Sequence, residues 1–216
     1  MSLTYHELRD RSLDRIEGLS DGVFAFAMTL IVFEIHVPDP ATITNEPQLW
    51  SALGAVAPSF VTFLLSLLTL GIAWNAQQTH LRYVARADRA FTWISLAFLA
   101  VISVFPFSTS LLAQFITFRI ALALYWLNLF LFGAAFHWCI SYARSARLLS
   151  DDAPNELSTV MQRRVVVAQS LYGFGALLAL VSTSLSISFI VAVQLYFALA
   201  LGPRIPLLRR TVIGRG

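Results

Sequence analysis

Three residues able to carry charge or hydrogen bonds stand at the start of the first apolar run: Arg15, Ser20 and Asp21. A carboxylate placed just inside an apolar helix is costly, so it normally marks a polar partner or an ion pathway. Ser20 and Asp21 are also residue types that cap helix N-termini and stabilise them through the helix dipole. The residue types alone leave both interpretations open, a cap and a polar site within the membrane.

An apolar stripe follows on the same predicted helix. At 3.6 residues per turn, six residues fall within roughly 60° of the direction of Phe26. They are Gly22, Phe26, Thr29, Leu30, Phe33 and Val37. Ser20 and Asp21 lie on the opposite side of the helix, so Asp21 is not expected to face what the stripe faces. The pattern by itself is typical of packing against lipid or neighbouring helices.

The remaining chemistry-bearing residues form no catalytic or metal-binding pattern. The histidines at 6, 36, 80 and 137 are scattered, without the spacing of metal ligands. No glycine-rich phosphate loop is present in the sequence. The single cysteine, Cys139, lies inside an apolar run. We therefore expect no enzymatic activity, no catalytic residues, no metal site and no cofactor.

The composition indicates that these residues are positioned by a membrane protein. Hydrophobic residues make up 57% of the 216 residues and charged residues 12%, with a mean hydropathy of +0.71. A soluble domain of this size carries about 25% charged residues. A lipid bilayer must therefore cover much of the surface. All fifteen cations are arginines placed between the apolar runs rather than on one patch, which argues against nucleic-acid binding.

The apolar runs predict an all-α, polytopic fold with one six-helix unit per subunit. A transmembrane helix needs roughly 20 mostly apolar residues, and six stretches meet or approach this length. They are residues 19–37, 53–76, 90–112, 117–143, 165–183 and 185–202. The last two are separated only by the Ser/Thr-rich residues 182–186, which we interpret as a tight turn. A single bent or interfacial helix is the alternative.

The arginines predict the orientation of the helices. If six helices cross the membrane, fourteen of the fifteen arginines fall on one side and only Arg119 falls on the other. Because arginine is enriched in cytoplasmic loops, both termini are expected in the cytoplasm. This gives a cytoplasmic N-terminal segment (1–18), a six-helix transmembrane domain (19–202) and a cytoplasmic basic tail (203–216).

The start of the first apolar run resembles a motif of a known family. The run Arg15-x-x-x-Leu19-Ser20-Asp21 resembles the Arg-x-x-x-Phe-Ser-Asp signature of the bacterial relatives of the lysosomal potassium channel, the transmembrane protein 175 family. Three further motifs of the second and third helices resemble family motifs. These are Trp74 with the polar residues after it, Trp93, and Pro106-Phe107-Ser108-Thr109.

The resemblance implies a homotetrameric cation channel in which the first helix of each subunit lines the pore. It implies that the four copies of Phe26 form the main hydrophobic ring around the pore and that the copies of Leu30 and of Phe33 form further rings. These three residues then form the constriction and gate. It places Gly22, Thr29 and Val37 beside the pore. It also implies a buried polar network that ties the first helix to the second and third: Arg15, Ser20, Asp21, Trp74, Gln78 and Ser95.

This chain departs from the family pattern at six positions. Leu19 replaces the signature phenylalanine, Gln77 and Gln78 replace histidines, and Ser95 replaces an asparagine. Phe26 and Phe33 are bulkier than the isoleucine or leucine that usually form the rings. The sequence has no Thr-Val-Gly-Tyr-Gly potassium filter.

We therefore predict a potassium-preferring cation channel in a bacterial inner (plasma) membrane. Its partners are potassium and other monovalent cations, the bilayer and three further copies of the chain. The alternative is a secondary transporter or a non-conducting membrane scaffold.

Overall fold

The chain folds as a bundle of helices in the computed structural model, which describes residues 5–199 and the side chains from residue 13 onward. Its elements are α1 (Tyr5–Leu30), the 3₁₀ turns η1 (Ile31–Glu34) and η2 (Pro40–Thr42), α2 (Glu46–Leu81), α3 (Arg89–Ser103), α4 (Phe105–Gln114), α5 (Arg119–Ser145), α6 (Leu157–Leu178) and α7 (Thr183–Ala198). Because α3 and α4 follow one another as a single apolar segment, the described chain forms six helical rods. The predicted all-α, six-helix fold is confirmed, whereas the expected basic tail (203–216) lies outside the described residues.

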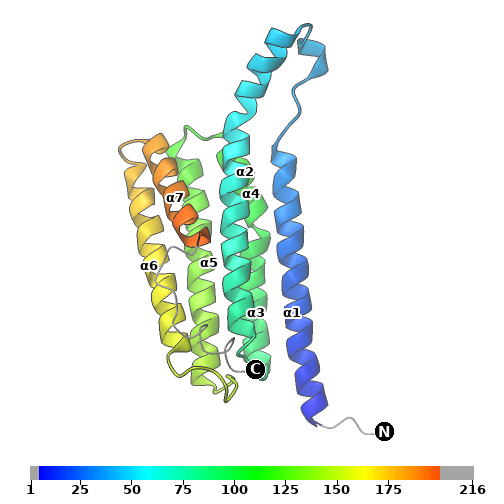
Figure 1. The fold of residues 1–216 in the computed structure, drawn as a ribbon, viewed down its shortest axis with the longest axis vertical. Helices are drawn as coiled ribbons and strands as arrows, with labels where there is room; N and C mark the ends of the chain where they lie inside the picture. Colours follow the sequence, from blue (N-terminus) through cyan, green and yellow to red (C-terminus); the bar gives the residue numbers. More distant parts are fainter. Residues whose placement is uncertain (1–4, 200–216) are drawn as a thin grey trace, which may run out of the picture.

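Four helical segments of the described chain are long and apolar enough to cross a membrane. They are Leu13–Glu34, Glu46–Leu81, Arg89–Gln114 and Arg119–Ser145. The helix α7 is apolar but has only 16 residues, and α6 carries Arg163 and Arg164 in its first half. The protein is thus a multi-pass membrane protein. Figure 1 shows α1 at one edge of the bundle and α6 and α7 at the opposite edge, with α2 to α5 between them.

The first helix differs from the predicted span 19–37 at both ends. It starts at Tyr5, because the polar residues before Leu19 include many good helix formers that a count of apolar residues does not detect. The predicted segment 1–18 is therefore largely continuous with the first span. The α-helix ends at Leu30 and tightens into η1, and the backbone leaves the helix before Pro38.

The second helix starts seven residues before the predicted position 53. Asn45 caps it, since its side chain accepts a hydrogen bond from Gln48 N at 3.0 Å, and Pro47 occupies the first turn. The 36 residues of α2 span about 54 Å, well beyond the roughly 30 Å of a hydrocarbon core. In Figure 1 the first turns of α2 and the link from α1 extend past the other helices.

Local chemistry also explains the other differences from the predicted spans. Val104 separates α3 from α4, because Pro106 has no N–H to continue the hydrogen-bond ladder. The helix α6 starts at Leu157, before the predicted residue 165. The predicted turn at 182–186 lies earlier, at residues 179–182, and Ser182 caps α7 by accepting a hydrogen bond from Leu185 N.

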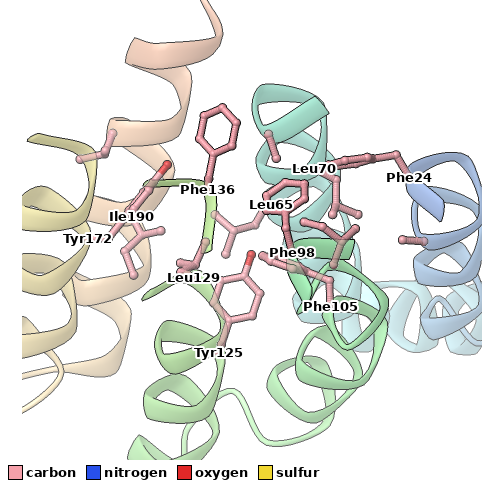
Figure 2. Packing of buried hydrophobic residues seen from close by; sticks show 14 of the residues in the cluster. Phe24, Leu65, Leu70, Phe98, Phe105, Tyr125, Leu129, Phe136, Tyr172 and Ile190 are labelled. Carbon is pink, nitrogen blue, oxygen red and sulfur yellow. The ribbon is translucent and has the colours of Figure 1, made fainter. Parts of the chain in front are cut away.

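Aromatic side chains fill the centre of the bundle. Phe24 from α1 packs against Phe98 from α3 with ring centroids 6.2 Å apart, and Phe105 from α4 meets Tyr125 from α5 edge-on at 5.9 Å. All four rings are buried. Figure 2 shows Phe24 entering this core from one side and Tyr172 and Ile190 from the other. The core therefore joins every long helix of the described chain.

The α5–α6 contact depends on one glycine. The side chain of Gln169 on α6 crosses to α5 and donates a hydrogen bond from Nε2 to the carbonyl oxygen of Leu129 at 3.0 Å. Gly133 on α5 leaves the space for it, because a Cβ atom at this position would overlap Nε2 and Cδ of Gln169. Gly71 on α2 is a useful comparison, since no atom lies within 4 Å of the place where its Cβ would be.

We predict that Gly133→Ala lowers the stability of the protein by about 1–3 kcal/mol relative to Gly71→Ala, because the amide must leave its site and lose its hydrogen bond. Both substitutions gain the same helix propensity, so their difference isolates the clash. Thermal unfolding in detergent measures it. The prediction fails if the two variants have the same melting temperature. It also fails if their melting temperatures still differ when both carry Gln169→Ala.

Candidate functional site

The helical segment formed by α1 and η1 has one face that packs against the rest of its own chain. Ile16, Ser20, Phe24, Ala27 and Ile31 recur every three or four residues and are all buried. They pack against α2, α3 and α4. This face fixes which side of α1 points away from the bundle.

The opposite face of α1 is apolar and uncovered. Phe26 and Phe33 are 65% and 71% exposed, and Gly22 and Thr29 are exposed beside them. Leu30 is half-buried. The structure thus places five of the six residues of the predicted stripe on or beside one face of the helical segment.

Val37 differs from the rest of the stripe, because it lies in the non-helical segment after η1 and is 87% exposed. A helical wheel does not apply at this position.

Two residues of α1 are tied to α2 by side-chain hydrogen bonds. The Ser20 hydroxyl donates to Oε1 of Gln77 at 2.5 Å, in a fully buried position. The Asp21 carboxylate accepts from Nε1 of Trp74 at 2.8 Å and from Nε2 of Gln78 at 2.6 Å. The Asp21 contacts are exposed on the single chain, whereas the Ser20 contact is not. We call these three contacts the α1–α2 polar clamp.

Two residues that the resemblance assigned to this network lie outside it. Arg15 is exposed and makes no ion pair with Asp21 in the part of the chain that the structure describes. Ser95 is buried on α3 but makes none of the clamp's hydrogen bonds. Gln77 was not among the predicted network residues, although its place in the Trp74 run was a signal. All three partners in the clamp, Trp74, Gln77 and Gln78, lie on α2, so the clamp joins α1 to α2 and not to α3.

Thr29 contributes the polar group of the exposed face. Its hydroxyl donates to the carbonyl oxygen of Phe26 at 2.8 Å. Because the hydroxyl proton is used within the helix, the oxygen presents only acceptor lone pairs to its surroundings. An oxygen acceptor on an otherwise apolar face suits a cation better than an anion.

An open groove of about 380 Å³ runs beside this face. It is lined mainly by α1 residues, among them Gly18, Gly22, Phe26 and Leu30, and by the junction of α3 and α4. The groove is largely apolar. Among residues 5–199, no three His, Cys, Asp or Glu side chains approach one another closely enough to hold a metal ion.

The arrangement defines a class of protein. It is a polytopic helical bundle whose first helix is clamped on one side and offers an apolar face, with one acceptor hydroxyl, on the other. Such a face is suited to line a passage or to contact another membrane-embedded helix.

Comparisons with known proteins agree with this class. The family model described as the endosomal/lysosomal potassium channel TMEM175 matches residues 15–106. A potassium channel of Chamaesiphon minutus is 32% identical over 189 residues, covering 86% of this chain and 93% of that protein. A potassium channel of Streptomyces collinus is 40% identical over 102 residues, which are 47% of this chain and 48% of that protein. The chain thus spans about half the length of this second relative.

The fold is also similar to a solved structure. The crystal structure of a lysosomal potassium-selective channel TMEM175 homolog from Chamaesiphon minutus matches with a TM-score of 0.77 and 28% identity. The match covers 89% of this chain and all of that one. The chain belongs to the TMEM175 family. The resemblance predicted from the first helix is confirmed, and membership of a family of ion channels confirms that the chain is not an enzyme.

The clamp geometry gives a prediction for Asp21. Asp21→Ala leaves the Trp74 and Gln78 donors without their acceptor, so we expect a loss of about 1–3 kcal/mol in stability. The potassium-to-sodium flux ratio of the protein that still assembles should not change, since the carboxylate points to α2. Thermal unfolding and liposome flux measure the two effects.

Asp14→Ala is the matched control, because Asp14 is an exposed carboxylate on the same helix. We expect it to melt like the unmodified protein. An Asp21→Ala variant of normal stability and altered selectivity would show that Asp21 faces the ion path.

Proposed function

We propose that four copies of the chain assemble around one axis as a potassium-preferring cation channel, with α1 of each copy lining the pore. The observation that carries the proposal is the division of the helical segment formed by α1 and η1 into a buried face and an exposed apolar face. Phe24 and Ile31 are at most 1% exposed, whereas Phe26 and Phe33 are more than half exposed. The named function of the Chamaesiphon and Streptomyces relatives, both potassium channels, supports the choice of ion.

The packing inside one chain favours a pore formed between subunits over a pore within each chain. Its centre is filled by closely packed aromatic and aliphatic side chains such as Phe98, Phe105 and Leu129. A water path through that centre would have to displace them, and protein interiors are packed as densely as organic crystals. A closed ring of identical subunits instead places one α1 from each subunit on a common axis.

The exposed apolar residues of α1 supply the constriction in this proposal. Four Phe26 side chains that converge on an axis leave a narrow apolar neck, and such a neck gates by losing its water. Phe33 adds a second ring further along. Leu30, which is half-buried beside the groove, contributes less of its surface to the axis than either phenylalanine.

The residues around the constriction have separate roles. Thr29 offers its acceptor oxygen next to the Phe26 ring. Gly22 adds no side chain and leaves the pore wider on the side of the chain's N-terminus. Asp21 does not line the pore in this proposal, because both of its clamp partners come from α2. Potassium selectivity then rests on the width of the neck and the cost of dehydrating the ion.

The arginines support an orientation with both termini in the cytoplasm of a bacterial cell. Arg86 in the α2–α3 link donates to the carbonyl oxygen of Arg147 in the α5–α6 link at 3.1 Å, and Val84 pairs with Leu149. These contacts bring Arg82, Arg86 and Arg89, around the α2–α3 link, to the same end of the bundle as Arg144 and Arg147, at the end of α5. Arginine-rich links mark the cytoplasmic side, which for this bacterial-type channel is the inner face of the plasma membrane.

We predict that Phe26→Ala raises potassium flux and weakens discrimination against sodium, because a smaller ring widens and wets the neck. Phe174→Ala is the matched control: it is the same change at a 53% exposed phenylalanine on α6, at the far edge of the bundle. The control should leave flux unchanged. Flux into liposomes under a potassium gradient measures both variants. Flux of the unmodified protein without any coupling ion also distinguishes a channel from a coupled transporter or a non-conducting scaffold.

Two results would contradict this placement. If Leu30→Ala raises flux and Phe26→Ala does not, the gate lies one turn further along α1. If neither substitution changes flux, α1 does not line a pore.

We also predict that cysteines placed at Phe33 in different copies react with one another. Cys139 is the native cysteine and is buried, so a Cys139→Ser parent gives a clean background. A short bis-maleimide should link Phe33→Cys copies in membranes, because their side chains face one axis, and should not link Phe174→Cys copies. Native mass measurement should give four copies. Equal linking at both positions, or monomers only, would refute the ring.

A further inference from the structure

Polar side chains from four helices meet inside the apolar core, away from α1. They are Ser66 and Thr69 on α2, Thr109 on α4, Tyr125 on α5 and Gln194 on α7, and none is more than 3% exposed. We call this group the core polar cluster. Polar groups within membrane-spanning helices are costly unless each finds a partner, so the donors and acceptors of the cluster must be accounted for.

The two threonines fix the direction of most hydrogen bonds. The Thr69 hydroxyl donates to its own helix, to the carbonyl oxygen of Leu65 at 2.9 Å. Since a hydroxyl has a single proton, Thr69 is the acceptor in its contact with Nε2 of Gln194. This contact ties α7 to α2. It uses one of the two Nε2 protons of Gln194.

The same reasoning applies on the α4 side. The Thr109 hydroxyl donates to the carbonyl oxygen of Phe105 at 2.9 Å. The Ser66 hydroxyl is therefore the donor in its 2.7 Å contact with Thr109. Ser66 and Thr109 have no proton left for any other group of the cluster.

Two protons and one acceptor remain: the Tyr125 hydroxyl proton, the second Nε2 proton of Gln194, and Oε1 of Gln194. The Tyr125 hydroxyl lies 3.3 Å from the Ser66 oxygen and 3.5 Å from the Thr69 oxygen, both longer than the 2.7–2.8 Å usual for O–H···O bonds. Oε1 of Gln194 is buried and has no hydrogen-bond partner within the described residues. The cluster thus contains a loosely bound donor and an unpaired acceptor at one place.

We propose that the core polar cluster is a binding site for a water molecule, which donates to Oε1 of Gln194 and accepts from the Tyr125 hydroxyl. Water supplies both roles at once, and buried waters typically satisfy such unpaired groups. The cluster contains no carboxylate to balance a charge, and its two uncommitted protons, on the Tyr125 hydroxyl and on Nε2 of Gln194, are donors that a cation cannot accept. Both features favour a neutral ligand over a cation. The site is independent of the proposed pore.

The bound water completes the attachment of α7. In the described chain α7 packs on α6 and α2, and Gln194 is its buried link to α2. Gln194 already interacts directly with Tyr125, and the water adds a second link between α7 and α5. The cluster then acts as one unit across α2, α4, α5 and α7.

The first test is direct. A density map of the full-length protein in lipid, at a resolution that shows ordered waters, should contain a peak about 2.6–3.2 Å from Oε1 of Gln194. The peak should be absent from Gln194→Met. A map that shows this oxygen unpaired and dry, or paired with a protein group, overturns the proposal.

The second test uses stability and does not need a map. Gln194→Met and Tyr125→Phe should each lower the melting temperature by about 2–4 °C, and the double variant should fall by less than the sum, because both changes remove the same water. Additive shifts, or a higher melting temperature for Gln194→Met as expected from removing a dry unpaired acceptor, overturn the proposal.

A third measurement separates water from an ion. The melting temperature should be the same in potassium, sodium and choline chloride at equal ionic strength. A rise specific to one cation, lost in Gln194→Met, would show that the cluster binds that cation instead of water.

Discussion

The rotation of α1 about its own axis decides what the protein offers to its surroundings. Ser20 and Asp21 are successive residues, about 100° apart on the helix, and both are bonded to side chains of α2. Two hydrogen bonds in different directions oppose rotation of α1 about its axis. In lipid, apolar faces have little preference for one another, so polar contacts and close packing set helix orientation. Phe24 packs against Phe98 in the same rotation and leaves Phe26 facing outward.

The two edges of the bundle are attached by the same kind of contact. The helix α1 is held by the α1–α2 polar clamp, and α7 by Gln194 and Thr69. Between them, the centre of the bundle is joined by aromatic packing. Because α2 takes part in both attachments, it is the helix on which the two edges depend. The buried polar groups of the two edge helices therefore fix how α1 and α7 are placed against α2. The apolar core supplies most of the packing between the helices.

Local patterns in the sequence predicted the global features. Hydropathy predicted six helices, and the helical wheel placed Phe26 away from Ser20, because both signals repeat along the chain. Among the polar partners, the family resemblance named Trp74 and Gln78 with Asp21, whereas Gln77 was missed. Helix starts were wrong where a cap or a polar helical stretch decides them, as at Asn45 and Tyr5. Contacts between distant residues left no local pattern: Ser20 and Gln77 are 57 positions apart, and Thr69 and Gln194 are 125 apart. Arg15 was placed in the network by resemblance, and the glutamines here satisfy Ser20 and Asp21 without it.

The proposed channel requires that the outward face of α1 lines an axis shared by identical subunits. A structure of the protein reconstituted in lipid nanodiscs shows whether it does. We expect a particle with four-fold symmetry in which Phe26 points at the axis while Phe24 remains packed on Phe98 of its own chain. A particle in which α1 contacts lipid along its Phe26 face, with another helix at the axis, would refute the proposed pore.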